Sequence, residues 1–126
     1  MSKEKREYNI EDRLVAYAAM VIALTESLPD TRAGNHIAGQ LLRSGTSPAP
    51  NYGEAEAAES RNDFLHKMGV CLKELRESRI WLRIIARRAL LSEAEVSPVL
   101  AETEELIRIF KASIATAKKN APDGRV

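Results

Sequence analysis

The chain has 126 residues, of which 44% are hydrophobic and 29% charged, a balance typical of one globular domain. Cys71 is its single cysteine, which excludes an intrachain disulfide and favours a reducing compartment. The net charge of +1 argues against a globally basic nucleic-acid binder, and no apolar run suits a bilayer span or a signal peptide, so we expect a cytoplasmic protein.

The first expected helix follows Asn9, which forms a capping-box pattern with Asp12. Apolar side chains then recur at alternating steps of four and three residues, which predicts one face packed against other helices. These positions are Ile10, Leu14, Tyr17, Val21, Leu24 and Leu28. Pro29 ends the helix, and Val15 and Ile22 lie off this face.

The second expected helix begins after Asp30 or Thr31, either of which can cap it. Its apolar face is short. It consists of Ile37, Leu41 and Leu42.

An interruption follows, because Pro48 and Pro50 lack an N–H and disfavour helical geometry in the residue before each of them. We expect a loop within 44–50 and a helix that restarts with Asn51 as its cap, while Glu54 reaches back to the break. This predicts a bend with local capping. An active-site loop is the alternative, since loops often carry function.

The third and longest helix has Ser60 and Asp63 as a capping-box pattern. Its predicted core face is Phe64, Met68, Cys71, Leu75, Ser78, Leu82, Ile85 and Ala89.

Ser92 and Glu95 form another capping-box pattern before the fourth helix. Because proline is comfortable only in a first turn, Pro98 predicts that the main body begins at Ser97. Its predicted core face is Val99, Thr103, Leu106, Phe110, Ile114 and Ala117.

No segment shows the two-residue alternation of a strand. The predicted fold is therefore all-α, an antiparallel up-down-up-down four-helix bundle with a kinked or broken second helix. We expect residues 1–126 to form a single domain, with flexible ends at 1–8 and 120–126.

The middle of the chain carries a family resemblance. It contains the segments RSGTS (43–47), NYGEA (51–55), SRNDFLHK (60–67), LKELRES (72–78) and WLRII (81–85). In this order and spacing the chain resembles the four-helix bundle proteins encoded in intervening sequences of 23S ribosomal RNA genes. The resemblance implies a four-helix bundle that assembles into a ring-shaped homo-oligomer, a pentamer.

A related branch of that family widens the candidate partners. The accessory variability proteins of diversity-generating retroelements bind nucleic acid and a reverse transcriptase through a basic surface. The resemblance therefore implies RNA or DNA as candidate partners, and a reverse transcriptase if the chain belongs to a retroelement. The chain departs from the family pattern at Pro48 and Pro50, where Val and Ala are more usual, and it is less basic than this branch.

Basic residues concentrate in the third helix. Residues 61–88 hold eight basic and three acidic side chains, a net charge of +5 that leaves −4 for the rest of the chain. At about 100° per residue, several arginines fall on one stripe of this helix. The candidate nucleic-acid-binding residues are Arg76, Arg79, Arg83, Arg87, Lys73 and Arg61.

Two interpretations of this basic stripe stay open. The arginines pair with acids of neighbouring helices, such as Glu102, Glu104 and Glu105, or of another subunit. Alternatively, they bind phosphates through the forked geometry of the guanidinium group.

Apolar residues outside the core faces predict self-association, because they leave hydrophobic surface on the first and third helices. The alternative is that they widen the internal core. The candidate interface residues are Val70, Ile80, Trp81, Ile84, Val15 and Ile22.

Catalytic and metal-binding patterns are weak. A di-iron bundle needs two Glu-x-x-His pairs, and only Asp63 with His66 comes close, whereas His36 has Ala33 three residues before it. Cys71 lies on a predicted core face, where a buried thiol is inert. We expect no catalytic residue, no metal and no cofactor.

The leading hypothesis is a non-enzymatic, self-associating helical bundle that acts as an adaptor or scaffold and binds nucleic acid through the basic stripe. The alternative is a purely structural or protein-binding module without a nucleic-acid partner. An enzyme is the third hypothesis, and no membrane partner is expected.

Overall fold

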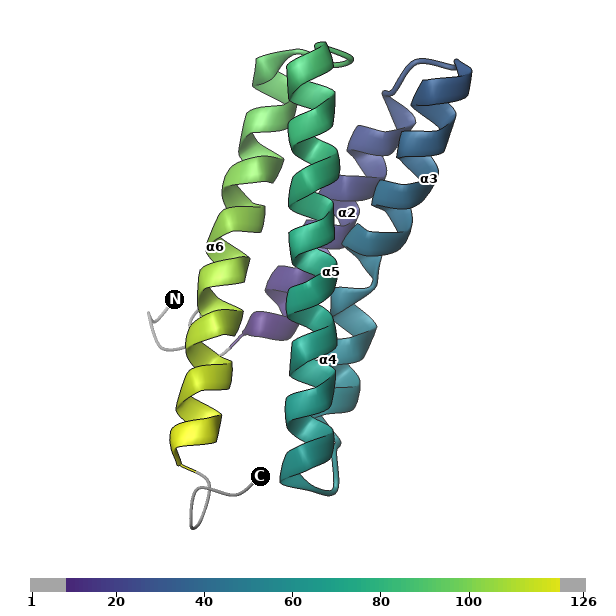
Figure 1. The fold of residues 1–126 in the computed structure, drawn as a ribbon. Coiled ribbons are helices and arrows are strands. Elements are labelled where there is room, and N and C mark those ends of the chain that lie inside the picture. Colours follow the sequence, from purple (N-terminus) through teal and green to yellow (C-terminus); the bar gives the residue numbers. More distant parts are fainter. Residues whose placement is uncertain (1–8, 121–126) are drawn as a thin grey trace.

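Residues 9–120 are described by a computed structural model, and helices account for most of them. They are α2 (Ile10–Glu26), α3 (Arg32–Thr46), α4 (Pro48–Glu56), α5 (Arg61–Arg88) and α6 (Glu93–Lys119), with no strand in this range. Since α4 continues from α3, the chain builds four helical units, and Figure 1 shows successive units running in opposite directions. The predicted all-α four-helix bundle is confirmed. Apart from Asn120, the predicted flexible ends lie outside the described residues.

The core lies between the four units, because α5 packs on α3, α4 and α6 while α2 packs mainly on α3. The predicted apolar faces supply most of its side chains. The largest buried ones are Tyr17, Phe110, Leu14, Leu41, Leu75, Leu82, Ile85 and Leu106. Two predicted core positions are wrong: Leu42 is 41% exposed, and Ala89 is exposed at the end of α5.

The interruption between α3 and α4 is one residue, Ser47, which lies within the predicted range 44–50 but is shorter than a loop. Pro48 and Pro50 occupy the first turn of α4, where backbone N–H groups have no partner inside the helix, and the chain tolerates both prolines there. Asn51 is not a cap, because it lies inside α4 and donates from Nδ2 to the carbonyl of Ser47 at 3.0 Å. The predicted reach of Glu54 to the break is also wrong, since its carboxylate binds Lys67 on α5.

Side-chain caps begin α3 and α5. Thr31 rather than Asp30 caps α3, accepting from the N–H of Gly34 at 3.0 Å, and Ser60 caps α5. Asn9 makes no side-chain cap for α2, since its Nδ2 donates to Asp12 instead. The first predicted capping box is therefore wrong.

Helix α6 begins at Glu93, as the Ser92–Glu95 pattern predicted, and it is continuous, so the predicted separate start of its main body at Ser97 is wrong. The Ser92–Glu95 capping box is complete and sets the start before Pro98 is reached. Pro98 lacks only the N–H that would bind the carbonyl of Ala94. Because Ala94 is exposed, water can satisfy that carbonyl, and the helix continues through the proline.

Candidate interaction surface

Part of the basic stripe on α5 is open to solvent. Lys73, Arg76, Arg83 and Arg87 are all exposed. None of the ion pairs found among residues 9–120 includes any of these four side chains. These cations therefore carry charge that the described part of the subunit does not neutralise.

The other two predicted members of the stripe hold α5 against α6. Arg79 pairs with Glu104 at 3.2 Å, and its Nε is buried without a hydrogen-bond partner among the described residues. Arg61 donates from Nη1 to the carbonyl of Ala117 at 2.9 Å. The pairing interpretation thus fits Arg79, while Glu102 pairs with Arg13 and Glu105 with Arg108 instead.

Two exposed isoleucines lie among the free arginines. Ile80 is 46% exposed and Ile84 is 38% exposed. A shallow hollow of about 310 Å³ lies over this part of α5. Its lining residues, which we call the α5 surface patch, are Ile80, Arg83, Ile84, Arg87 and Arg88. The sequence analysis counted Arg88 as a basic residue but did not assign it to the candidate site.

Trp81 is less available than its neighbours. The half-buried indole donates from Nε1 to Glu77 at 3.0 Å, and its ring meets the His36 ring edge-on at 5.9 Å. Arg43 of α3 also pairs with Glu77. Hydrogen bonds from Arg43 first and Trp81 second hold the pKa of Glu77 below its usual range. Trp81 therefore links α5 to α3 within the subunit.

The remaining predicted interface residues lie apart from the α5 surface patch. Val70 is half-buried on α5. Val15 and Ile22 on α2 are 55% and 41% exposed. Neither of these α2 residues lines the α5 surface patch, and α2 packs mainly on α3.

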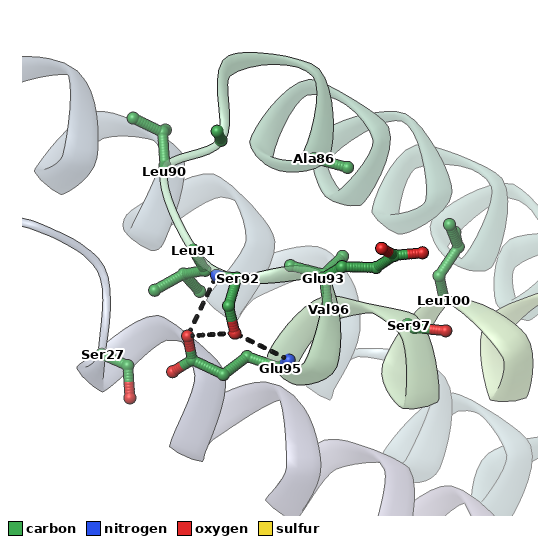
Figure 2. Close-up of a pocket in the computed structure, with 11 residues that line it drawn as sticks. Ser27, Ala86, Leu90, Leu91, Ser92, Glu93, Glu95, Val96, Ser97 and Leu100 are labelled. Atoms are coloured by element: carbon green, nitrogen blue, oxygen red, sulfur yellow. Dashed lines mark hydrogen bonds between the residues drawn. The ribbon is translucent and has the colours of Figure 1, made fainter.

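A cavity of about 770 Å³ opens at the end of the bundle where α5 turns into α6, which the sequence analysis did not predict. Its apolar lining is Ala86, Ala89, Leu90, Leu91, Val96 and Leu100. Its polar lining is Ser27, Ser92, Glu93, Glu95 and Ser97. Figure 2 shows the carboxylates of Glu93 and Glu95 pointing in different directions from the first turn of α6. We call this hollow the end cavity.

The sequence did contain a signal for Glu95, one of the two acidic residues that line the end cavity. Oε1 of Glu95 accepts from the N–H of Ser92 at 3.0 Å and from its hydroxyl at 2.9 Å (Figure 2). These bonds hold the pKa of Glu95 below its usual range. The capping-box pattern located this carboxylate, but the depth of the cavity depends on how α2, α5 and α6 meet.

The groups with catalytic potential are poorly placed for chemistry. Cys71 is buried, its thiol donates to the carbonyl of Pro48 at 3.5 Å, and burial raises its pKa to about 12. His66 and Asp63 are exposed on the first turns of α5. Within residues 9–120 no three His, Cys, Asp or Glu side chains gather closely enough to hold a metal ion.

Among the described residues, every helix is too short or too polar to cross a bilayer.

Comparison with known protein families matches residues 6–112 to the family described as 23S rRNA-intervening sequence protein. Among solved structures, the chain is similar to a protein of unknown function from the S23 ribosomal protein family of Bacteroides thetaiotaomicron. The two share 28% sequence identity with a TM-score of 0.78, over 83% of this chain and 97% of that one. No curated protein matches the chain.

Proposed function

Since the chain belongs to the 23S rRNA-intervening sequence protein family, we propose that it is a non-enzymatic, self-associating scaffold whose α5 surface patch contacts another copy. The assembly is a ring-shaped homo-oligomer, a pentamer by the resemblance to its family. An adaptor of this kind presents several identical surfaces to its partners at once.

One observation carries the proposal: Ile80 and Ile84 are exposed side by side with arginines that have no acidic partner in the described subunit. Protein interfaces combine an apolar centre with arginine, which suits this composition. Burying two isoleucines against a sister copy removes apolar area from water at roughly 25 cal/mol per Å². The same contact gives the arginines a site at which to meet acids.

The test is the mass of the particle in solution, measured by sedimentation or light scattering over a range of concentrations. We expect the wild-type chain to form a discrete oligomer and Ile80→Gln/Ile84→Gln to shift it toward the monomer. Leu42→Gln is the matched control, because Leu42 is also exposed but lies on α3. A wild-type monomer at every concentration would refute the proposal.

The exposed apolar side chains of α2 need a test of their own. Val15→Gln/Ile22→Gln reports whether the exposed apolar side chains of α2 also take part in assembly. A smaller particle for this variant adds α2 to the interface. An unchanged particle confines the interface to other surfaces.

A second candidate function, nucleic-acid binding, is favoured by the free cations Lys73, Arg76, Arg83 and Arg87 on one face of α5. Guanidinium groups bind phosphates through paired hydrogen bonds. We would titrate the protein with duplex and single-stranded RNA and DNA at two salt concentrations. Binding to duplex DNA should weaken with a logarithmic slope of about −0.9 per phosphate neutralised. Replacing the three arginines with Gln should flatten that slope, and no binding at low salt would refute this function.

A further inference from the structure

The end cavity presents negative charge that the described part of the subunit leaves without a cationic partner. No ion pair found among residues 9–120 includes Glu93 or Glu95. Oε1 of Glu95 takes both hydrogen bonds from Ser92, which leaves Oε2 free for a further donor. Helix α2 ends at the same cavity with Ser27 and has no basic residue in its last turn. The negative end of its dipole adds to the attraction for a cation, while the positive end of α6 at the same cavity is offset by Glu93 and Glu95 in its first turn.

The α5 surface patch has the opposite character. It combines three arginines, Arg83, Arg87 and Arg88, with the aliphatic side chains of Ile80 and Ile84. The end cavity combines an apolar lining with two carboxylates, those of Glu93 and Glu95, which we call its acidic rim. The two surfaces are therefore opposite in charge, and each has apolar area that the other can cover.

These two surfaces do not satisfy each other within one subunit. The arginines and the glutamates belong to one helical hairpin, yet no ion pair within 4.0 Å joins Arg83, Arg87 or Arg88 to Glu93 or Glu95. Figure 1 shows that α5 ends and α6 begins at the same end of the bundle, so the two surfaces lie at one level along its length. A neighbouring copy placed side by side can bring its patch to this cavity.

We propose that the end cavity of one copy receives the α5 surface patch of the next copy, with Arg83, Arg87 and Arg88 meeting the acidic rim and Ile80 and Ile84 covering the apolar lining. This inference rests on the proposed self-association and names the two surfaces that meet. If the patch of each copy enters the cavity of the next, the contact is heterologous and builds a closed ring or an open filament, whereas a two-fold dimer would need both pairings between the same two copies. Their common level along the bundle places the copies side by side rather than end to end.

Charge reversal tests this pairing. Arg83→Glu/Arg87→Glu places acids opposite the acidic rim, and Glu93→Arg places one arginine opposite the arginines of the patch. Each change alone should raise the concentration needed for half-assembly roughly tenfold or more, because like charges then face each other. Glu95 is left unchanged in both variants, since it caps α6.

Recovery of assembly in a chain that combines the changes is the decisive measurement. The chain that carries all three changes has its charges exchanged but complementary, so it should assemble at a lower concentration than either parent variant. Mixing the two parent variants should recover assembly in part, since the acidic patch of one fits the basic rim of the other, while a ring of five must keep at least one contact between like copies. Far-ultraviolet circular dichroism and thermal melts of each variant separate loss of contact from loss of fold.

Two results would overturn the pairing without touching the proposed function. In the first, the wild type assembles, Arg83→Glu/Arg87→Glu weakens it, and Glu93→Arg assembles like the wild type. In the second, the triple variant stays as dissociated as its parents.

If the wild type is monomeric without nucleic acid and the arginine variant loses nucleic-acid binding, the arginines serve phosphates and the pairing is wrong. A monomer under all conditions refutes the proposed function itself.

Discussion

Ala89 ends α5 in a conformation that favours glycine. Its φ of 54° and ψ of 41° are left-handed, and it is the only non-glycine residue with positive φ among residues 9–120. The N–H of Ala89 donates to Ala86 and that of Leu90 to Ile85, which forms a Schellman motif. An L-residue in this geometry costs about 1–2 kcal/mol, so the turn beside the end cavity holds local strain.

Replacing this alanine tests the strain. We expect Ala89→Gly to raise the free energy of unfolding by about 0.5–1 kcal/mol, because glycine adopts the left-handed region without steric cost. Urea denaturation at fixed protein concentration measures the change. Ala86→Gly is the matched control, since it lies inside α5 and should lower stability by about 1 kcal/mol. Equal destabilisation by both changes would contradict the strain.

At the scale of elements, the contact between α2 and α3 depends on one glycine. A Cβ placed on Gly45 would lie 2.7 Å from Cγ1 and 2.8 Å from Cγ2 of Val21. Both residues are buried, and the valine has no open space into which to turn without disturbing its neighbours. Gly39 lies on the same helix, but nothing approaches its Cβ position within 4 Å.

These two glycines make a matched pair of variants. Gly45→Ala should lower the free energy of unfolding by about 1–3 kcal/mol, because the added methyl overpacks the α2–α3 contact. Gly39→Ala should instead raise it by about 0.5–1 kcal/mol, since alanine is the better helix former. Thermal or urea unfolding of both variants decides the matter. Stabilisation by Gly45→Ala would show that the two helices can move apart freely.

Buried hydroxyl groups also join the helices through the core. The hydroxyls of Ser44 on α3 and Ser78 on α5 lie 2.8 Å apart, and those of Tyr17 on α2 and Thr103 on α6 lie 2.7 Å apart. Burial raises the pKa of Tyr17, while side-chain hydrogen bonding to Thr103 and Ser78 opposes that rise. These four hydroxyl-bearing residues form a buried layer to which each of the four helical units contributes one residue. Sliding one helix along its neighbour would break these contacts between helices, although Ser44 and Thr103 also donate to carbonyls of their own helices, those of Leu41 and Val99.

Removing one member of this layer should be more harmful than its size suggests. We expect Ser78→Ala to lower the free energy of unfolding by about 1–3 kcal/mol, because the buried Ser44 hydroxyl then keeps only its long hydrogen bond to the carbonyl of Leu41, at 3.5 Å. Ser44→Ala/Ser78→Ala should cost less than the sum of the two single changes. A double-mutant cycle measures this coupling. Strict additivity would show that the two hydroxyls stabilise the fold independently.

At the scale of the whole molecule, self-association makes stability depend on concentration. An assembly that forms only from folded subunits raises the melting temperature as protein concentration rises. We expect this dependence for the wild type and its loss in Ile80→Gln/Ile84→Gln, measured by calorimetry over a hundredfold range of protein concentration. A melting temperature that is constant for the wild type would contradict assembly in the folded state.

Most of the fold followed from local pattern. The positions of Leu14, Leu75 and Leu106 in the core follow from helical spacing, which depends only on neighbours along the chain. The predicted helix boundaries were wrong where a proline was compatible with more than one position in a helix. Pro48 in a first turn and Pro98 within α6 obey the same chemistry, but the start of each helix decides which N–H is missed.

The sequence predicted the residues of the candidate surface less accurately than it predicted the fold. Arg79 and Arg83 looked equivalent on one stripe, yet Arg79 pairs with Glu104 while Arg83 has no acidic partner within residues 9–120. Trp81 looked like exposed interface but lies against His36 and Glu77. Whether a side chain is used inside the subunit depends on helices distant in the sequence, and spacing along one helix carries no such information.

The sequence by itself determined that this protein is helical and which face of most helices is buried, because periodicity and capping act over a few residues. Only the tertiary structure decided which arginines remain free and that an acid-rimmed cavity opens where α5 meets α6. Both depend on distances between separate helices. Packing sets those distances, and packing is a property of the whole bundle.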